Sequence, residues 1–242
     1  MSTQLSHHLA EKHNISPLST YLREIVYGGT DGIVTTFAVV AGFAGAESQS
    51  VGLPILTVLL FGFANLAGDG VSMALGNFLS TMSEHDVFRN EEAKERYEIE
   101  KNPESEKEET IDILMEKGFT RVQATTMTEI YMTNPPYWLE FMMKDELSMS
   151  DPSGDKPIIM SLATFFSFLL FGLLPLIPYV LFRTNANVFL FSILTTAGSL
   201  MLLGVLRYRV TKQSFIRSVS ESLLLGGIAA SVAFGVGRLI KI

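Results

Sequence analysis

Asp69 is the residue whose type and position most clearly require a chemical explanation, because it is the only ionisable side chain in the stretch 48–83. Ionisable groups at membrane depth usually face a bundle interior or an aqueous path, and they mark routes for ions or protons. Residues four apart share one face of a helix, so Asn65, Met73 and Asn77 are expected beside it. Carboxylate oxygens suit divalent cations, and a thioether favours transition metals over Mg²⁺ or Ca²⁺. This face therefore predicts a path for Fe²⁺ or Mn²⁺.

A second carboxylate, Asp31, stands in the preceding apolar stretch YGGTDGIVTTFAVVAGFAGA. Thr35 lies on its helical face. Glu24 lies about two turns earlier, where we expect the cytoplasmic edge of a membrane span. Two simpler interpretations remain open: Asp31 is a helix-end residue that reaches the lipid headgroups, and Met73 only packs against apolar neighbours.

The stretch 84–116 is strongly acidic, with eleven Glu and two Asp against five Lys or Arg. It contains two glutamate pairs at i, i+3 spacing, Glu95 with Glu98 and Glu106 with Glu109. Such neighbours lie about 5–6 Å apart between Cβ atoms and repel each other. A bound cation would offset that repulsion.

A methionine-rich stretch, WLEFMMKDEL, follows and brings Met142, Met143 and Glu146 onto neighbouring turns. Together with the glutamate pairs, it predicts a site that collects metal ions. The alternative is an ordinary acidic helix whose charges are solvated.

The elements that must position these residues are membrane helices. Of the 242 residues 48% are apolar, the mean hydropathy is +0.31, and the apolar residues form long uncharged blocks. A helix needs roughly 20 apolar residues to cross a bilayer. The sequence therefore predicts an all-α membrane protein with five transmembrane helices, at about 25–46, 52–82, 158–182, 186–207 and 215–238.

A polar region of some seventy residues separates the second span from the third, and its pattern predicts helices. The expected domains are an N-terminal cytoplasmic segment, spans 1 and 2, a cytoplasmic acidic helical metal-binding domain and spans 3 to 5, at 1–24, 25–83, 84–156 and 157–242. Helices within the acidic domain are expected at 84–100, 104–117, 120–131 and 136–147. The second span is too long for a bilayer core of about 30 Å, so we expect it to continue into the first of these helices.

The distribution of Lys and Arg predicts the orientation of the spans. With the N-terminus inside, the inner segments hold fifteen of these residues and the outer segments hold three, as the positive-inside rule requires. The N-terminus and acidic domain are then cytoplasmic and the C-terminus lies outside. The first twenty residues lack the apolar core of a signal peptide, so the first span must direct insertion.

Composition also excludes several classes of protein. The chain has no cysteine, which excludes disulfides, thiolate metal sites and cysteine nucleophiles. An acidic segment is the opposite of a nucleic-acid-binding patch, so the expected partners are divalent metal ions and membrane lipids.

Four stretches, TDGIVTTFAVVAGFAGA, NLAGDGVSMALGNFLSTMSE, PPYWLEFMMKDEL and LLPLIPY, resemble the signature of the vacuolar iron transporter family. The resemblance extends from Arg23 to the C-terminus. It implies export of cytosolic Fe²⁺ or Mn²⁺ into a vacuole or out of a cell, for metal detoxification and homeostasis. It also implies proton-coupled antiport by a five-span homodimer with the path at the dimer interface. Zn²⁺ and Co²⁺ are further candidate ions, and no permanently bound cofactor is expected.

The resemblance assigns roles by motif position. In the acidic domain it implies metal binding by glutamates and methionines, namely Glu95, Glu98, Glu106, Glu109, Met142, Met143 and Glu146. In the membrane it implies Asp31 and Met73, with Glu24 at the cytoplasmic mouth. The family's plant-type members carry Glu at the position of Asn65 and a small residue at that of Asp69. Here the carboxylate lies one turn, about 6 Å, further toward the cytoplasm.

This arrangement looks more like the bacterial branch of the family, which favours a bacterial cytoplasmic membrane, with a vacuolar membrane as the alternative. A non-transporting metal sensor or buffer is the alternative function, although a buffer needs no carboxylates in the bilayer. A membrane-embedded di-iron carboxylate oxidase is a third hypothesis. That chemistry uses Glu-x-x-His pairs, and none of the four histidines follows a glutamate at that spacing.

Overall fold

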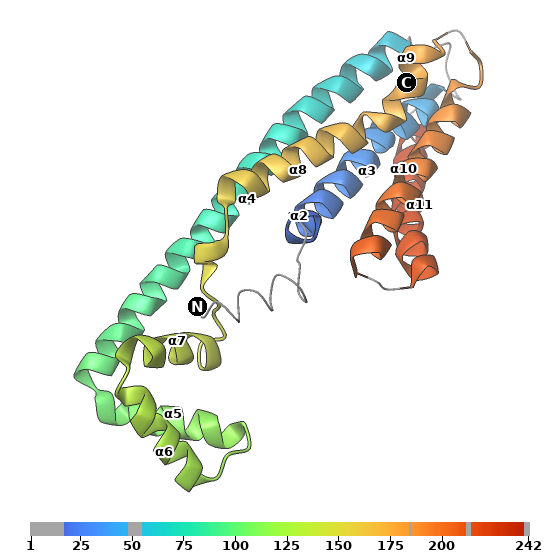
Figure 1. Ribbon diagram of the computed structural model, residues 1–242. Coiled ribbons are helices and arrows are strands. Elements are labelled where there is room, and N and C mark those ends of the chain that lie inside the picture. Colours follow the sequence, from blue (N-terminus) through green and yellow to red (C-terminus); the bar gives the residue numbers. More distant parts are fainter. Residues whose placement is uncertain (1–16, 48–54, 184, 212–213, 240–242) are drawn as a thin grey trace. The chain divides into compact units, whose positions relative to one another are not determined.

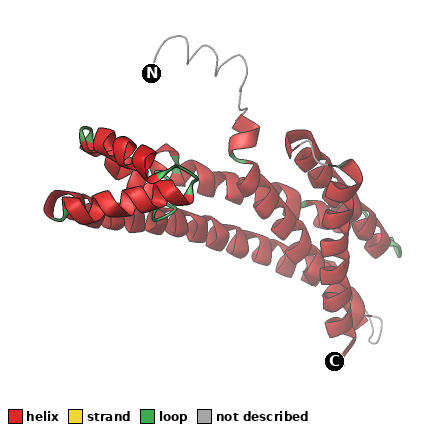
Figure 2. Ribbon diagram, turned by 90° about the horizontal axis from the view of Figure 1, so that it is seen from below, coloured by secondary structure: helices red, strands yellow, loops and turns green. Residues whose placement is uncertain are grey.

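The computed structural model describes residues 17–47, 55–183, 185–211 and 214–239. Within these ranges all regular structure is helical and no strand occurs (Figures 1 and 2). The chain divides into two compact units. We call Met1–Phe78 with Pro157–Ile242 the span unit, and Leu79–Lys156 the Glu-rich unit. The all-helical prediction is confirmed for the described residues.

The span unit contains the five helical segments expected to cross a membrane, together with the short helix α2. They are α2 Pro17–Thr20, α3 Leu22–Glu47, the first part of α4 Ile55–Lys101, α8 Pro157–Gly172, α9 Ile177–Leu181, α10 Val188–Thr211 and α11 Phe215–Leu239. Among the described residues, five segments are long and apolar enough to span a bilayer, which confirms five candidate spans. The predicted first residues of the second span, 52–54, lie outside the described residues.

The third span is not one regular helix. After α8 ends at Gly172, a 3₁₀ turn, η2 Leu174–Leu176, precedes the short helix α9. Pro175 and Pro178 explain this break, because proline lacks the backbone N–H that an α-helix needs. The Ser192 hydroxyl donates a hydrogen bond to the Pro175 carbonyl at 2.7 Å. A side chain of α10 thus satisfies a backbone group that water cannot reach in a membrane.

Helix α3 lies at the centre of the span unit and packs against α8, α10 and α11 (Figure 1). Its contact with α8 is close because glycines face it: a Cβ added at Gly32 would collide with the Phe168 carbonyl. The Ser167 hydroxyl also donates to the Ile25 carbonyl at 2.7 Å. Small residues and interhelical hydrogen bonds are the usual basis of helix packing in membranes.

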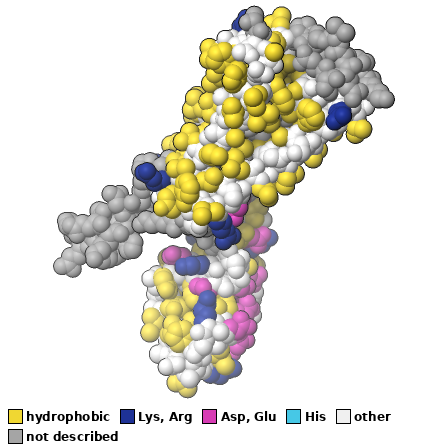
Figure 3. Space-filling view, turned by 90° about the vertical axis from the view of Figure 1, so that its right-hand side faces the viewer, with side chains coloured by type: hydrophobic (Ala, Val, Ile, Leu, Met, Phe, Trp, Pro, Cys, Tyr) yellow, Lys and Arg dark blue, Asp and Glu magenta, His cyan; other side chains and the backbone are white. Residues whose placement is uncertain are grey.

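The outer surface of the span unit is apolar. On the face shown in Figure 3, hydrophobic side chains cover most of this unit. Large exposed side chains occur along α4, α8 and α11, including Leu56, Leu170 and Leu224. Such a surface suits lipid rather than water, in keeping with membrane spans.

Helix α4 is one uninterrupted helix of 47 residues, or about 70 Å at 1.5 Å per residue. It contains no proline, and its polar part carries ion pairs at helical spacing, Lys94 with Glu91 and Arg96 with Glu92. Such pairs stabilise a helix. The boundary between the two units falls within α4, after Phe78.

The Glu-rich unit consists of the end of α4 with α5 Pro103–Glu116, α6 Arg121–Met132, α7 Pro135–Asp145 and the turn η1 Pro152–Gly154. Gly118, with φ of +98°, ends α5 in a Schellman motif. In this motif the Phe119 N–H donates to the Leu114 carbonyl at 3.2 Å. Thr120 and Gln123 then form a capping box that begins α6.

An apolar core holds the Glu-rich unit together. It consists of side chains from all four helices, namely Ile99, Ile111, Leu114, Ala124, Trp138, Leu139, Phe141, Met142 and Met143. On the face in Figure 3, Asp and Glu side chains gather on the surface of this unit. The packed core fixes the positions of the glutamates around it.

Candidate metal sites

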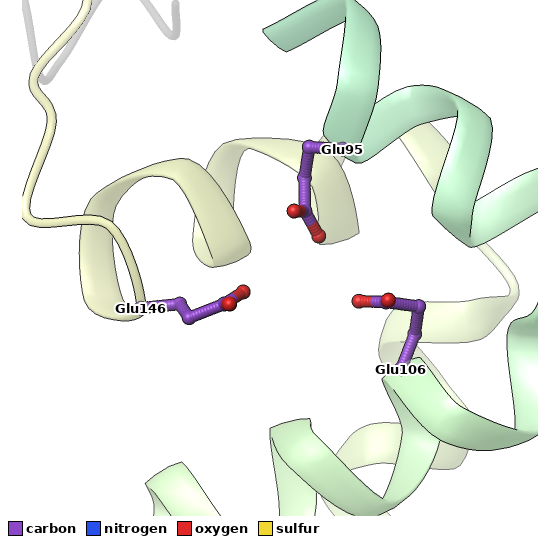
Figure 4. A group of neighbouring side chains, drawn as sticks. All are labelled: Glu95, Glu106 and Glu146. Atoms are coloured by element: carbon purple, nitrogen blue, oxygen red, sulfur yellow. The ribbon is translucent and has the colours of Figure 1, made fainter. Parts of the chain in front are cut away.

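Three glutamates from different elements converge in the Glu-rich unit. Glu95 belongs to α4, Glu106 to the first turn of α5, and Glu146 follows α7 directly. One carboxylate oxygen from each lies within 4.8 Å of the other two. Figure 4 shows the three carboxyl groups pointing toward one another. The arrangement offers oxygen ligands on several sides of one position, as a divalent cation requires.

The negative charges of this group change its acid–base properties. Burial, together with the charges of Glu95, Glu109 and Glu146, raises the pKa of Glu106 to about 8. Partial burial of its carboxyl group and the charges of Glu95 and Glu109 raise the pKa of Glu146 to about 7. Desolvation and like charges both favour the protonated form of an acid. At neutral pH the group therefore holds protons that a cation would displace.

Two oxygen atoms of this group are buried without a donor. Glu95 and Glu106 are only 7% and 5% exposed. Among the described residues no hydrogen-bond donor reaches Glu95 Oε1 or Glu106 Oε2. The two carboxyl groups are close enough to share a proton. Buried polar groups are normally paired, so these oxygens are available for a proton or a metal ion.

Glu98 and Glu109 lie at the edge of the same group. The charge of Glu98 acts on Glu95, and that of Glu109 acts on both Glu106 and Glu146. Each also has a local partner: Glu98 accepts from the Asn102 amide, and Glu109 accepts from the Ser105 hydroxyl at 3.2 Å. They add negative potential to the site formed by the other three.

The two methionines occupy different places. Met142 is fully buried in the core, and its sulfur lies 3.2 Å from the Thr110 hydroxyl. Met143 is also buried, and it lines a cavity of about 480 Å³ whose lining includes none of the three glutamates. The structure thus connects Met142, through Thr110, to the helix that carries Glu106. Ligation by either sulfur stays a prediction.

In the span unit, Asp31 and Asp69 are near enough for their charges to interact. Asp31 lines an open cavity of about 860 Å³ together with Arg23 and Arg207. The Thr35 hydroxyl donates to the Asp31 carbonyl at 2.8 Å, as expected for residues on one face of α3. The two carboxylates therefore belong to one electrostatic site on neighbouring helices.

Glu24 is 3% exposed, and no donor among the described residues reaches its Oε2 atom. An ionised carboxylate in this position would be costly. Buried polar atoms are normally paired, so this oxygen is a candidate ligand for a cation.

The other polar residues of α4 follow the predicted stripe. Asn65, Asp69, Met73 and Asn77 are all half-buried. Asn65 lines a cavity of about 500 Å³ between α3, α4 and α11. The Asn77 amide donates to the Thr164 hydroxyl of α8 at 2.7 Å, so this residue also connects two helices.

Sequence reasoning missed Thr110 and Trp138. The Trp138 indole N–H donates to the Thr110 hydroxyl at 2.8 Å, and both side chains are buried. A signal existed, because the chain's single tryptophan lies in the motif PPYWLEFMMKDEL and a buried indole N–H needs an acceptor. The identity of that acceptor depends on tertiary packing.

Comparisons with known proteins show which family the chain resembles. The model of the VIT family matches residues 22–238. The vacuolar iron transporter of Toxoplasma gondii (strain ATCC 50861 / VEG) is 34% identical over 96% of this chain and 78% of its own length. Vacuolar iron transporter 1 of Oryza sativa subsp. japonica is 30% identical over 97% of this chain and 90% of its own.

Vacuolar iron transporter 1 of Arabidopsis thaliana is likewise 30% identical, over 99% of this chain and 92% of its own length. These matches confirm the resemblance seen in the sequence motifs. Since the family model spans all five candidate membrane helices and the Glu-rich unit, the chain belongs to the VIT family.

Proposed function

We propose that the protein exports Fe²⁺, and also Mn²⁺, from the cytosol across a membrane in exchange for protons, and that it works as a homodimer. Its membership of a family of transporters, whose relatives are named vacuolar iron transporters, makes metal transport the activity to explain. The observation that carries the proposal is the set of buried carboxylate oxygens that no donor among the described residues reaches, on Glu24, Glu95 and Glu106.

The Glu-rich unit collects metal ions in this proposal. Glu95, Glu106 and Glu146 supply oxygen ligands, and Glu98 and Glu109 attract the cation. Oxygen ligands alone suit Mg²⁺, Ca²⁺ and Mn²⁺, whereas a thioether adds affinity for softer transition metals. Participation of Met142 or Met143 would thus favour Fe²⁺, Zn²⁺ and Co²⁺ over Mg²⁺ and Ca²⁺.

The span unit carries the transport path. Glu24 forms the cytoplasmic mouth, and Asp31, Asp69 and Met73 bind the ion within the membrane. Thr35, Asn65 and Asn77 supply further polar groups along this route. A carboxylate at bilayer depth costs roughly 2.5–3.5 kcal/mol on insertion scales, so it favours a proton whenever the metal ion is absent. Metal ions and protons therefore compete for the same oxygens, and this competition couples their movements.

An exposed stripe of small residues on α4 supports the homodimer. Ala64, Gly68, Ser72 and Gly76 follow each other at i, i+4 spacing, and all are exposed in the single chain. A Cβ added at Gly68 or Gly76 would meet nothing within 4 Å among the described residues. Such stripes let two membrane helices approach closely. A second copy packed here would bring its own Asp69 near the first.

The proposed orientation places the Glu-rich unit in the cytoplasm and the C-terminus outside, because of the Lys and Arg distribution. The proposed location is a bacterial cytoplasmic membrane, with a vacuolar membrane as the alternative. The ion then meets the glutamates before it meets the path.

A flux assay tests the function. The purified protein is placed in liposomes, and uptake of Fe²⁺, Mn²⁺, Zn²⁺ and Ca²⁺ is measured with and without a pH gradient. We expect gradient-dependent flux of Fe²⁺ and Mn²⁺ and none of Ca²⁺. Metal binding without any flux would favour the sensor or buffer instead.

Two substitutions on α4 test the path in the same assay. Asp69→Asn keeps size and polarity but removes the charge, so it should abolish gradient-driven Fe²⁺ flux. Met73→Leu keeps the volume but loses the sulfur, so it should reduce Fe²⁺ flux more than Mn²⁺ flux, since Mn²⁺ is the harder ion. Gly198→Leu on α10, where a Cβ meets nothing within 4 Å among the described residues, is the control. Wild-type flux in Asp69→Asn would refute the proposed path.

A further inference from the structure

A buried hydrogen-bond network joins α5 to α7 beside the three glutamates. Thr110 lies at its centre, with the Trp138 indole N–H donating to its hydroxyl oxygen at 2.8 Å. The same hydroxyl lies 2.7 Å from the Glu106 carbonyl and 3.2 Å from the Met142 sulfur. Thr110 and Met142 are fully buried and Trp138 is 2% exposed, so water does not take part.

This network lies directly next to the residues of the metal site. Thr110 follows Glu106 by four residues on α5, and Met142 on α7 precedes Glu146, the C-cap of that helix, by four residues. Residues four apart lie one above the other on a helix. The Thr110–Met142 contact therefore joins the turns adjacent to two of the three carboxylates. Because the Met142 sulfur is fully buried, it could bind a metal ion only on the side of the site that faces the core of the Glu-rich unit.

The Thr110 hydroxyl has one hydrogen and two acceptors. When it donates to the sulfur, it engages one of the two sulfur lone pairs and makes the sulfur a weaker donor to a metal ion. When the hydrogen turns to the Glu106 carbonyl, the sulfur is released and the hydroxyl still has an acceptor. Trp138 donates to the hydroxyl oxygen in either case, so the oxygen stays in place while the hydrogen changes partner.

We propose that Thr110 sets the preference of the site among metal ions, because its hydroxyl competes with the metal ion for the Met142 sulfur. Thr110 is thus a positioning residue that acts through Met142, and the inference rests on the metal site proposed above. The competition weakens binding of ions that use the sulfur, such as Zn²⁺. It leaves binding of Mn²⁺, a hard ion that prefers the carboxylates, nearly unchanged.

The test compares the affinities of two ions within each variant. Full-length protein in detergent is titrated calorimetrically with Zn²⁺ or with Mn²⁺. An Asp31→Asn, Asp69→Asn background removes the two carboxylates that are proposed to bind the ion within the membrane. Thr110→Val should raise the ratio of Zn²⁺ to Mn²⁺ affinity about threefold, given that a hydrogen bond contributes roughly 0.5–1.5 kcal/mol. Partial unfolding lowers the affinities for Zn²⁺ and Mn²⁺ by the same factor, so its effect cancels in the ratio of the two affinities.

Four further variants complete the comparison. Thr110→Ser keeps the hydroxyl and should restore the ratio of the background protein. Met142→Leu should lower the ratio, and adding Thr110→Val to Met142→Leu should change it no further. Thr128→Val is the matched control, because Thr128 is equally buried in the same unit and bonds only to the Ala124 carbonyl, at 2.9 Å.

The outcomes separate this inference from the proposed function. Glu106→Gln should strongly weaken the binding of both Zn²⁺ and Mn²⁺. Unchanged binding in that variant would refute the metal site itself. If Glu106→Gln weakens both ions but Thr110→Val leaves the ratio unchanged, the site stands and the role of Thr110 is wrong. An equal shift in Thr128→Val would also overturn the inference.

Discussion

At the scale of single residues, the carboxylates of the Glu-rich unit are poised between binding protons and binding metal ions. Glu106 and Glu146 have pKa values of about 8 and about 7 because they are desolvated and face other negative charges. At pH 7 Glu106 is therefore mostly protonated and Glu146 about half protonated, whereas metal ligation requires the carboxylate. If the site binds metal as proposed, protons and metal ions compete for these carboxylates within the physiological pH range.

This exchange predicts a pH dependence of binding. Because the pKa values of Glu106 and Glu146 are raised, these carboxyl groups are partly or mostly protonated below about pH 8. In that range a cation must displace the protons to bind. Mn²⁺ affinity should therefore rise at least about tenfold between pH 6.5 and 8.5. Calorimetry on the full chain in two buffers of different ionisation enthalpy should also report proton release near pH 7.

Helical content, followed by circular dichroism over the same pH range, controls for unfolding. Constant Mn²⁺ affinity and no proton release, in a protein whose helicity does not change, would contradict this account of the glutamates.

At the scale of elements, α4 combines three surfaces. Leu66 and Gly70 face the span unit and are buried, and the stripe that contains Asp69 is half-buried. The small residues Gly68 and Gly76 are exposed. Asn65, Asp69 and Asn77 each come directly after a small residue in the sequence. The polar stripe therefore lies about 100° around the helix from the stripe of small residues. A helix with this pattern can pack against its own bundle and a second copy while its polar stripe remains between them.

This geometry predicts that Gly68→Leu disrupts the proposed homodimer without unfolding the single chain, because a side chain at Gly68 meets nothing within 4 Å among the described residues. Light scattering or crosslinking in detergent should show a shift from dimer to monomer. Gly198→Leu, equally unobstructed on α10, should leave the dimer intact. A stable dimer in Gly68→Leu would mean that another face forms the interface.

At the scale of the whole molecule, the chain combines a unit that suits lipid with one that suits water. The apolar surface of the span unit and the acidic surface of the Glu-rich unit require different solvents (Figure 3). At the ends of α10 and α11, Arg207 and Arg217 both pair with Glu221, at 2.8 and 2.9 Å. This leaves net positive charge, as expected on the cytoplasmic side.

The predicted orientation has a direct test. A reporter fused after Ile242 should respond as an external domain, and a reporter inserted after Gly118, at the turn between α5 and α6, should respond as a cytoplasmic one. A cytoplasmic reporter after Ile242 with an external one after Gly118 would invert the topology. Equal responses from the two reporters would exclude three spans between these positions. Flux measured on both fusions controls for misfolding.

The sequence by itself determined the properties that depend on neighbouring residues. Hydropathy over windows of about 20 residues identified the candidate spans, since a bilayer requires that length. The i, i+4 spacing put Asn65, Asp69 and Met73 on one face, because helix geometry is regular. The motifs of the VIT family could be recognised for the same reason, because each is a contiguous stretch of the sequence. In the sequence, the only signs of the helix break after Gly172 were Pro175 and Pro178. The exact position of the break depends on how the helices pack.

Only the tertiary structure decided which side chains meet across helices. Spacing paired Glu95 with Glu98, whereas the closest group joins Glu95 to Glu106 and Glu146 from other elements. Likewise, no local pattern connects Trp138 and Met142 with Thr110. Helical periodicity states which way a residue faces on its own helix. The partner it meets depends on how the apolar core packs the helices, and packing arises from contacts between residues far apart in the chain.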